Sequence, residues 1–209
     1  ADHVALLVYH HQVKASGSQT DDRKQHYQTA VALRQAIAIV STSLDHTAIL
    51  DQLIAALNSA LSFDRAHAFL VDNGKLHLLV NGYTDRDKAG TQPIALEAIW
   101  QDHPLTEQIL ENKEPVLLND TSVATDWPTR LEDTAVRSWL GVPLMAGGNV
   151  LGLLQIESDT VDNFTEYDNL LATSLGAHAA VALQNAALYQ KTQRQLTELN
   201  TLYQASATM

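Results

Sequence analysis

The chain of 209 residues contains no cysteine. This absence excludes disulfides, thiolate metal ligands, thiol nucleophiles and any cofactor attached through a thioether. The sequence also has no run of 18 apolar residues, and its first residues, Ala1-Asp2-His3, lack the basic start of a signal peptide. We therefore expect a cytoplasmic segment that makes no contact with a membrane.

Positive charge is scarce. The sequence has 13 Lys and Arg against 24 Asp and Glu, which gives a formal net charge of −11. A chain this acidic repels phosphate backbones, so we expect no nucleic acid partner. Hydrophobic residues make up 45% and charged residues 18%, proportions typical of a globular protein.

Two β-hairpins are predicted from paired turn residues. Asn73-Gly74 joins apolar runs at 65–72 and 75–81, and Gly147-Gly148 joins runs at 137–146 and 149–157. The two turns imply these facing pairs: His67 with Val80, Phe69 with Leu78, Ala146 with Asn149, Pro143 with Gly152 and Trp139 with Ile156. In the first hairpin Ala66 and Ala68 share the face suited to packing against helices, and His67 and Phe69 share the other. Pro143 must occupy an edge-like or irregular position, because it cannot donate to a strand ladder.

The remaining elements follow from periodicity and caps. They are a helix over 46–61 capped by Asp45, a strand over 93–99, a helix over 103–112, a strand over 115–118 and a polar loop over 119–136. A last helix begins at Phe164-Thr165, with Thr165 as its cap, and continues to about residue 205. A helix of that length exceeds what a compact domain needs for its own core.

A further helix is predicted over 22–44, because apolar residues recur there at steps of three and four. Together with leucines of the last helix, this stripe predicts a dimer seam. The candidate interface residues are Leu33, Ile37, Val40, Leu44, Leu188, Leu199 and Leu202.

Several motifs in order carry a family likeness. They are Arg137-Ser138-x-Leu-x-Val-Pro-Leu, Leu-Gly-x-Leu at 151–154, Phe164-Thr165-x-x-Asp168, and Val-Ala-Leu-Gln-Asn-Ala-Ala-Leu-Tyr at 181–189. Over residues 30–190 the chain resembles a GAF domain. The resemblance implies an α+β fold (an α/β sandwich), with a GAF-like antiparallel sheet, helices packed on one face and long N- and C-terminal connecting helices.

The ends of the chain are similar to parts of its middle. Residues 2–8 resemble 177–183, and 206–209 resemble 41–44. We interpret 1–22 as the end of a preceding domain and a linker, 23–190 as the GAF domain, and 191–209 as an exit helix towards a following domain.

The resemblance also places a ligand pocket on the sheet face opposite the terminal helices. The candidate lining residues are Phe69, Leu118, Asp120, Asp126, Trp127, Arg130, Arg137, Trp139 and His67. Trp127 and Trp139 would stack on a flat ligand, and Arg130 or Arg137 would pair with a carboxylate or phosphate. Alternatively, Trp139 belongs to the core and the charged residues form loop salt bridges or caps.

The sequence lacks residues that the known ligands and activities of the family require. The cyclic-nucleotide-binding members resemble a pattern of which Phe164 and Asp168 remain, but Asp162-Asn163 and Asn169 depart from it, which makes cyclic nucleotide doubtful. Covalent bilin and methionine sulfoxide reduction both require cysteine in this family. The histidines are spread over separate elements and predict no metal site, so the cofactor stays unknown.

These observations predict a non-catalytic sensory or regulatory domain of a multidomain signal-transduction protein, such as a histidine kinase or a nucleotide cyclase. It would bind a small-molecule ligand, relay a signal through dimeric helices, or do both, as a homodimer formed by its terminal helices. The alternative is a ligand-free structural and dimerisation spacer in a tandem array.

Overall fold

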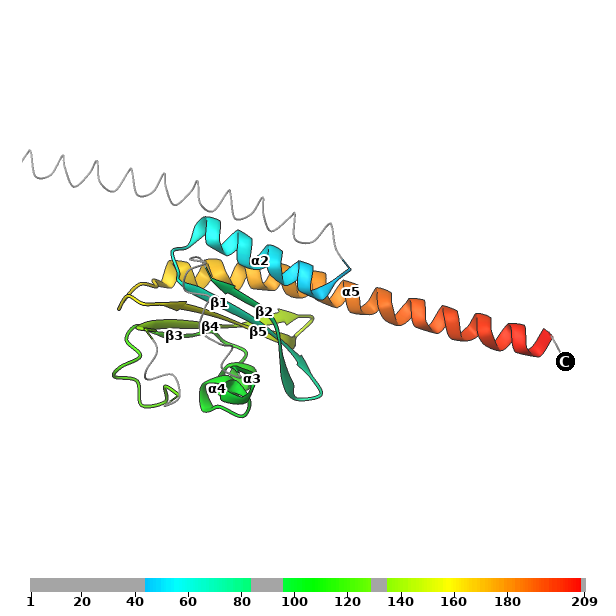
Figure 1. The fold of residues 1–209 in the computed structure, drawn as a ribbon, viewed down its shortest axis with the longest axis horizontal. Helices are drawn as coiled ribbons and strands as arrows, with labels where there is room; N and C mark the ends of the chain where they lie inside the picture. The colour runs from blue at the N-terminus through cyan, green and yellow to red at the C-terminus, as the bar shows by residue number, and fades with distance from the viewer. Residues whose placement is uncertain (1–43, 84–95, 129–134, 208–209) are drawn as a thin grey trace, which may run out of the picture.

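The computed structural model describes residues 44–83, 96–128 and 135–207. Its elements are α2 (His46–Ala60), β1 (Arg65–Asp72), β2 (Lys75–Tyr83), α3 (Leu96–Trp100), α4 (Pro104–Asn112), β3 (Val116–Leu118), β4 (Ser138–Ala146), β5 (Asn149–Ser158) and α5 (Glu166–Ala207). The strands form one antiparallel sheet in the order β2-β1-β5-β4-β3. In Figure 1, α2 and α5 cover one face of this sheet, and the short helices α3 and α4 lie on the opposite side. The predicted α+β fold is confirmed.

Side-chain caps fix where the two long helices begin. Asp45 accepts a hydrogen bond from the backbone N–H of Thr47 at 3.0 Å, as predicted for the start of α2. At the start of α5, the Asp168 carboxylate accepts from the backbone N–H of Thr165 at 2.8 Å, and the Thr165 hydroxyl accepts from the N–H of Asp168 at 3.3 Å. This reciprocal pair is a capping box, which satisfies backbone donors that the first helical turn leaves open.

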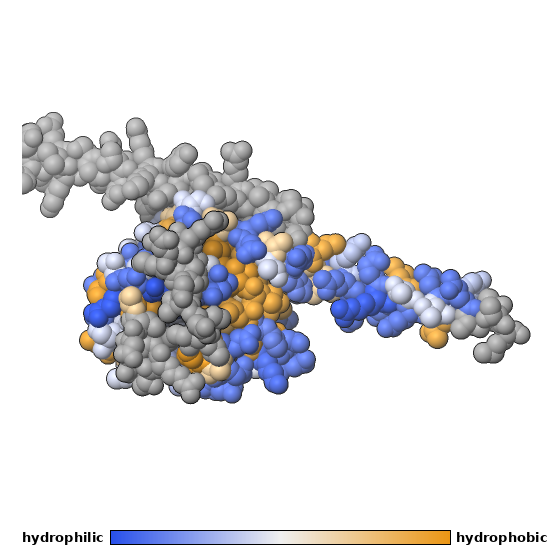
Figure 2. Space-filling view, in the orientation of Figure 1, coloured by the Kyte–Doolittle hydropathy of each residue, from blue (hydrophilic) through white to orange (hydrophobic). Residues whose placement is uncertain are grey.

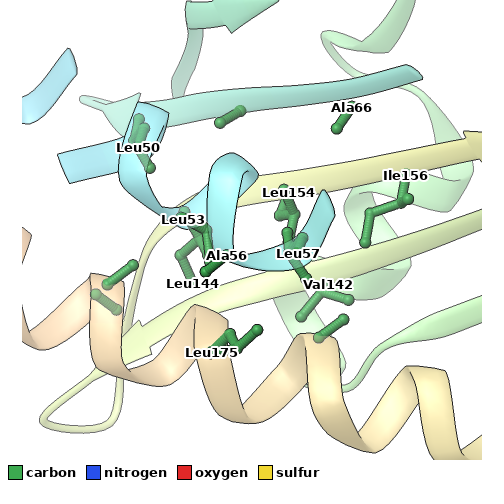
Figure 3. Close-up of a cluster of buried hydrophobic side chains, with 14 of the residues drawn as sticks. Leu50, Leu53, Ala56, Leu57, Ala66, Val142, Leu144, Leu154, Ile156 and Leu175 are labelled. Atoms are coloured by element: carbon green, nitrogen blue, oxygen red, sulfur yellow. The ribbon is translucent and has the colours of Figure 1, made fainter. Parts of the chain in front are cut away.

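The main core lies between the sheet and the helices α2 and α5. Figure 3 shows leucines of α2 pointing at the sheet, with Ala66 and Leu154 among the strand residues that face them. Ala66 and Ala68 are both fully buried there, on the face predicted to receive helices. Small side chains on β1 therefore allow the helical layer to approach closely.

A bulge changes the predicted register of the first hairpin. Phe69 faces Leu78 as predicted, but the register shifts between Ala68 and Phe69, so Val80 faces Ala68. The predicted pair of His67 with Val80 is wrong. One extra residue on a strand moves the following side chains to the other face, and Val80 accordingly belongs to the core beneath α2.

A second bulge does the same in the other hairpin. Ala146 faces Asn149 as predicted, but a shift between Leu144 and Met145 puts Pro143 opposite Leu153 and Trp139 opposite Glu157. The predicted partners Gly152 and Ile156 are each wrong by one residue. The edge-like position of Pro143 is confirmed, because β3 pairs with β4 only over residues 139–141.

Two other predictions concern helices. The strand expected over 93–99 is wrong where the structure describes it, because Leu96–Trp100 is the helix α3. The predicted long last helix is confirmed: α5 has 42 residues, and its last buried residue is Ala186. The entry helix predicted over 22–44 lies outside the described residues except for Leu44.

The exit from the domain is a long exposed stretch of α5. Every residue from 187 to 204 is exposed, so the helix extends beyond the domain in Figure 1. None of the helices in the described ranges is both long enough and apolar enough to cross a bilayer.

Candidate functional site

The sheet face turned away from α2 and α5 holds the candidate site, and we call it the floor. The strand registers place three rows of residues across β1, β5 and β4 on this face. The rows are Arg65, Glu157 and Trp139; His67, Gln155 and Gly141; and Phe69, Leu153 and Pro143. Polar and aromatic residues therefore share a surface on the side of the sheet opposite the main core.

An aromatic cluster covers part of the floor. The ring of Trp100, from α3, stacks on that of Trp139, with centroids 5.2 Å apart and planes 8° apart. Trp127 meets both rings edge-on, at centroid distances of 5.8 and 6.1 Å. The missing side chain of Gly141 makes room for this arrangement, because a Cβ there would collide with the Trp139 ring and with Ile109 of α4. Aromatic packing of this kind adds stability beyond its buried area.

The centre of the floor holds a buried amide. Gln155 is completely buried, and neither its Nε2 nor its Oε1 has a hydrogen-bond partner among the described residues. The indole Nε1 atoms of Trp100 and Trp139 are likewise buried and unpartnered in the described part of the chain. A buried polar group without a partner costs about 1–3 kcal/mol, so such a group needs an explanation.

A charged row borders the amide. Arg65 Nε donates to Glu157 Oε2 at 2.9 Å, and Arg65 also pairs with Asp159. On the other side, His67 Nε2 lies 3.6 Å from Glu157 Oε1. Burial alone would raise the pKa of Glu157, but the charges and hydrogen bonds of His67 and Arg65 outweigh burial and hold that pKa below its usual range. Glu157 is therefore a buried carboxylate that stays ionised.

A hollow opens beside the aromatic cluster. It has a volume of about 420 Å³ and lies between α3, the start of α4 and the loop after β3. Its lining residues are Ala98, Ile99, His103, Pro104, Thr125, Asp126, Trp127 and Pro128. Trp127 is the member of the aromatic cluster that lines this hollow.

His103 lines the hollow and also caps the start of α4. Its Nδ1 accepts a hydrogen bond from the backbone N–H of Leu105 at 3.3 Å, which caps the helix. Burial lowers the pKa of His103, although the carboxylates of Asp126 and Glu107 act in the opposite direction. The ring is thus neutral at pH 7, as an acceptor in a cap must be.

The structure brings most of the predicted site residues to this region. Phe69, Trp139 and His67 are buried on the floor, and Leu118 packs beside them at the sheet edge. Trp127 and Asp126 line the hollow. Arg130 lies outside the described residues.

Asp120 and Arg137 have local structural contacts. The Asp120 carboxylate accepts from the backbone N–H and the hydroxyl of Ser122, at 3.0 and 2.7 Å. Arg137 Nη2 lies 3.7 Å from the same carboxylate oxygen. The bonds from Ser122, and then the charge of Arg137, lower the pKa of Asp120. The contact between Arg137 and Asp120 matches the alternative of a loop salt bridge, and the bonds from Ser122 hold Asp120 within a turn.

Trp100, Gln155 and His103 are not among the site residues predicted from the sequence. Trp100 lies one residue beyond the strand predicted over 93–99, and a strand prediction gives no indication of its place in a helix above the floor. Gln155 offered one signal, a single polar residue inside the apolar run of β5, and that signal was not used. His103 stood directly before Pro104 at a helix start, where a side chain often acts as a cap.

A second groove lies on the opposite side of the sheet, where α5 leaves the domain. It has a volume of about 670 Å³ and is mostly apolar, with Leu70, Leu79, Leu151 and Leu183 among its lining residues. Figure 2 shows a hydrophobic area between α5 and the β1–β2 hairpin. Within the described ranges, no group of His, Asp and Glu side chains is placed to hold a metal ion.

Solved structures with a similar fold come from several bacteria. The GAF domain of a phosphoenolpyruvate-protein phosphotransferase from Coxiella burnetii has a TM-score of 0.64 at 18% identity, covering 80% of this chain and 98% of its own. The free methionine-R-sulfoxide reductase of Neisseria meningitidis, in complex with its substrate, has a TM-score of 0.62 at 19% identity, covering 79% and 93%. The fRMsr of Staphylococcus aureus, in its reduced form, has a TM-score of 0.60 at 16% identity, covering 75% and 94%.

These neighbours correct one prediction. We expected a non-catalytic chain because the sequence resembles sensory modules. A reductase bound to its substrate has the same fold, so this fold accommodates catalysis. The prediction that the chain is not an enzyme is therefore wrong, because the fold on which it rested also occurs in enzymes. The lack of cysteine bears on thiol chemistry alone.

Family membership rests on the sequence itself. A family model described as GAF domain matches residues 43–184, which is more than half of the chain. The search of curated proteins found no match to this chain. The predicted boundaries at residues 22 and 190 stay predictions. The match agrees with the five-stranded antiparallel sheet and the fold neighbours, and the chain belongs to the GAF domain family.

Proposed function

We propose that this GAF domain binds a small polar molecule on the floor of its sheet and relays the binding event through α5. One observation carries the proposal: the amide of Gln155 is completely buried at the centre of the floor and has no partner among the described residues. A ligand that accepts from its N–H groups and donates to its oxygen would remove that penalty.

The surrounding groups favour a planar ligand with hydrogen-bond acceptors. Two unpartnered indole N–H groups, from Trp100 and Trp139, act only as donors. The rings of Trp100 and Trp139 already lie parallel, and flat surfaces of this kind suit stacking. The hollow beside Trp127 is the entrance we propose, with His103 and Asp126 at its rim.

Contacts through β4 support the relay. The side chain of Leu144 lies between Gly152 of β5 and Gly176 of α5. A Cβ added at either glycine would lie 3.1 Å from a methyl carbon of Leu144. A shift of the floor strands would therefore press on α5 through a tightly packed contact. The proposed output is a change in α5 that reaches an effector domain. An effector of the histidine-kinase or cyclase kind and a cytoplasmic location stay part of this proposal.

The proposed dimer uses exposed leucines. Leu44, Leu188, Leu199 and Leu202 are between 47% and 67% exposed, which supports their assignment to an interface. The other candidates, Leu33, Ile37 and Val40, lie outside the described residues.

A second candidate function is a structural and dimerisation spacer. The stacked tryptophans favour it, because Trp100 and Trp139 are both completely buried and fill space that a ligand would need. In this case the floor would be a second core, and only the helical contacts would matter.

Native mass spectrometry of freshly purified protein, with an absorbance scan, tests the proposal. We expect a retained small molecule that is lost from Gln155→Met. It should be kept by the control Gln184→Met, which changes a half-buried glutamine of α5 remote from the floor. If all three proteins carry no added mass, and none is stabilised by a panel of metabolites, the spacer function replaces ligand binding.

A further inference from the structure

The two bulge residues of the sheet both line the second groove, which lies between α5 and the β1–β2 hairpin. The bulge in the first hairpin leaves Leu79 out of the strand pairing, and the bulge in the other hairpin leaves out Leu151. Both side chains belong to the lining of the groove. Bulges often redirect a side chain beside a functional site. Two separate irregularities of the sheet thus contribute to one surface groove.

The groove has the size and the apolar lining of a small-molecule site. Its volume of about 670 Å³ lies within the range of about 300–1,000 Å³ that is typical of ligand pockets. Leu70, Leu79 and Leu151 are half-buried and pack against the main core, and the buried Leu183 of α5 completes the apolar part. Figure 2 shows this hydrophobic area at the surface. An apolar molecule laid on these leucines would extend the core and remove their exposed area from water.

The polar groups of the lining favour a carboxylate. The Nε2 atom of His46 is buried and has no hydrogen-bond partner in the described part of the chain, and Lys191 forms no ion pair there. Gln190 donates to the backbone oxygen of Leu44 at 3.3 Å, which holds this part of α5 against the start of α2. The neighbouring Asp45 caps α2 and is not part of the lining. A carboxylate can accept from both the imidazole and the ammonium group.

The charge of the groove differs from that of the whole chain. The formal net charge is −11, yet the groove has Lys191 and two histidines against a single acid, Asp72. The Asp72 carboxylate accepts from the side-chain amide of Asn73 at 3.0 Å. A cationic ligand would be repelled by Lys191, and an uncharged apolar ligand would leave the Nε2 atom of His46 unpartnered. An anionic head group matches this lining best.

We propose that this groove binds a free carboxylic acid with an apolar body, of the kind of a medium-chain fatty acid. Its carboxylate lies between His46 and Lys191, and its chain lies along the leucines. The site is on the other side of the sheet from the floor and is independent of the ligand proposed there. Because Leu183, Ala187 and Lys191 line it, the acid would contact α5 directly where this helix leaves the domain.

Isothermal titration calorimetry of the full chain with decanoate tests the head group. We expect one decanoate to bind per chain, below the concentration at which it forms micelles, and decylammonium, with the same chain length and the opposite charge, to bind at least about tenfold more weakly. Lys191→Gln should weaken decanoate binding about tenfold, and Lys191→Arg should keep most of the affinity, because a charge-assisted hydrogen bond is lost only in the first. Equal binding of the two amphiphiles, or equal affinity of Lys191→Gln and the unaltered protein, would refute the assignment of a carboxylate.

A steric variant tests the position of the apolar chain. Ala187→Phe places a ring in the groove from an exposed position of α5 and should abolish decanoate binding. Ala55→Phe is the matched control, because Ala55 is exposed on α2 and lies outside the lining. Circular dichroism verifies that both variants keep the fold. If both variants bind decanoate, or if neither does, the acid does not occupy this groove.

The tryptophans separate this site from the floor. The chain has three tryptophans, and all of them belong to the aromatic cluster on the floor. Decanoate in the groove should leave tryptophan emission unchanged and should bind Gln155→Met as tightly as the unaltered protein. Emission that follows saturation, with weaker binding to Gln155→Met, would place the acid on the floor instead. An empty floor in native mass spectrometry contradicts the proposed function alone, and a lack of decanoate binding contradicts the groove site alone.

Discussion

Replacing Gln155 by methionine tests the central feature of the floor. Methionine has nearly the same length and shape but carries no amide, so it keeps the packing and removes both buried polar atoms. In the ligand-free domain, those atoms have no hydrogen-bond partner among the described residues. The variant should therefore be more stable than the natural protein when no ligand is bound.

The size of the gain follows from the cost of the buried amide. An unpartnered buried polar group costs about 1–3 kcal/mol, and methionine does not incur this cost. For a domain of this size, each kcal/mol corresponds to about 2–4 °C in Tm. Loss of the amide should thus raise the Tm of ligand-free protein by several degrees and lower its affinity for any ligand of the floor.

The assay must begin from ligand-free protein. Both proteins are unfolded in denaturant, dialysed and refolded, and their urea midpoints are then compared at equal slope. Gln193→Met, at an exposed position of α5, controls for the general effect of the substitution and should change stability little. If Gln155→Met destabilises the ligand-free domain by more than about 1 kcal/mol, the amide makes a favourable contact and the reasoning from an unpartnered group fails.

Three further predictions concern stability. Gly152→Ala should destabilise the domain by about 1–3 kcal/mol or more in urea unfolding, because its Cβ would collide with the backbone oxygen of Phe69, which cannot move aside. Thr165→Ala should cost about 1 kcal/mol by the same assay, since it removes half of the capping box of α5, and Thr165→Ser should retain most of that contribution. Because the pKa of Glu157 is held below the ordinary value for a glutamate, its stabilising contribution is present above that ordinary value and is lost as the pH falls through the folded-state pKa. Urea midpoints between pH 3 and 7 should show this loss. Glu157→Gln should be less stable at pH 7, and its stability should fall less between pH 7 and pH 3. An equal fall in both proteins would contradict the role assigned to Glu157.

Much of the fold could be predicted because its signals are local. Asn73-Gly74 and Gly147-Gly148 specify their turns through positive φ, which the structure shows at all four residues. Asp45 and Thr165 specify helix starts through one or two hydrogen bonds each. Signals of this kind need no knowledge of the rest of the chain.

The bulges could not be predicted in the same way. A regular pairing counted outwards from each turn is correct up to the bulge and wrong by one residue beyond it. Nothing local to Leu79 or Leu151 marks the extra residue, because both are ordinary strand residues. A bulge depends on how the whole sheet twists and on which side chains it must bury.

The same dependence explains which part of the candidate site was missed. Phe69 lies on the predicted face because alternation is regular beside the turn, and Trp139 lies on the face to which the family resemblance assigned the pocket. The bulge in β5 decides what lies beside them: it puts Glu157 opposite Trp139, and so Gln155 opposite Gly141. Without it, Ile156 would face Trp139, and the floor would present apolar side chains where the structure has an amide and a carboxylate. The polar character of the floor thus depends on Leu151 being left out of the pairing, and deleting Leu151 should remove the bulge while Gln155 stays opposite Gly141 and Glu157 stays opposite Trp139.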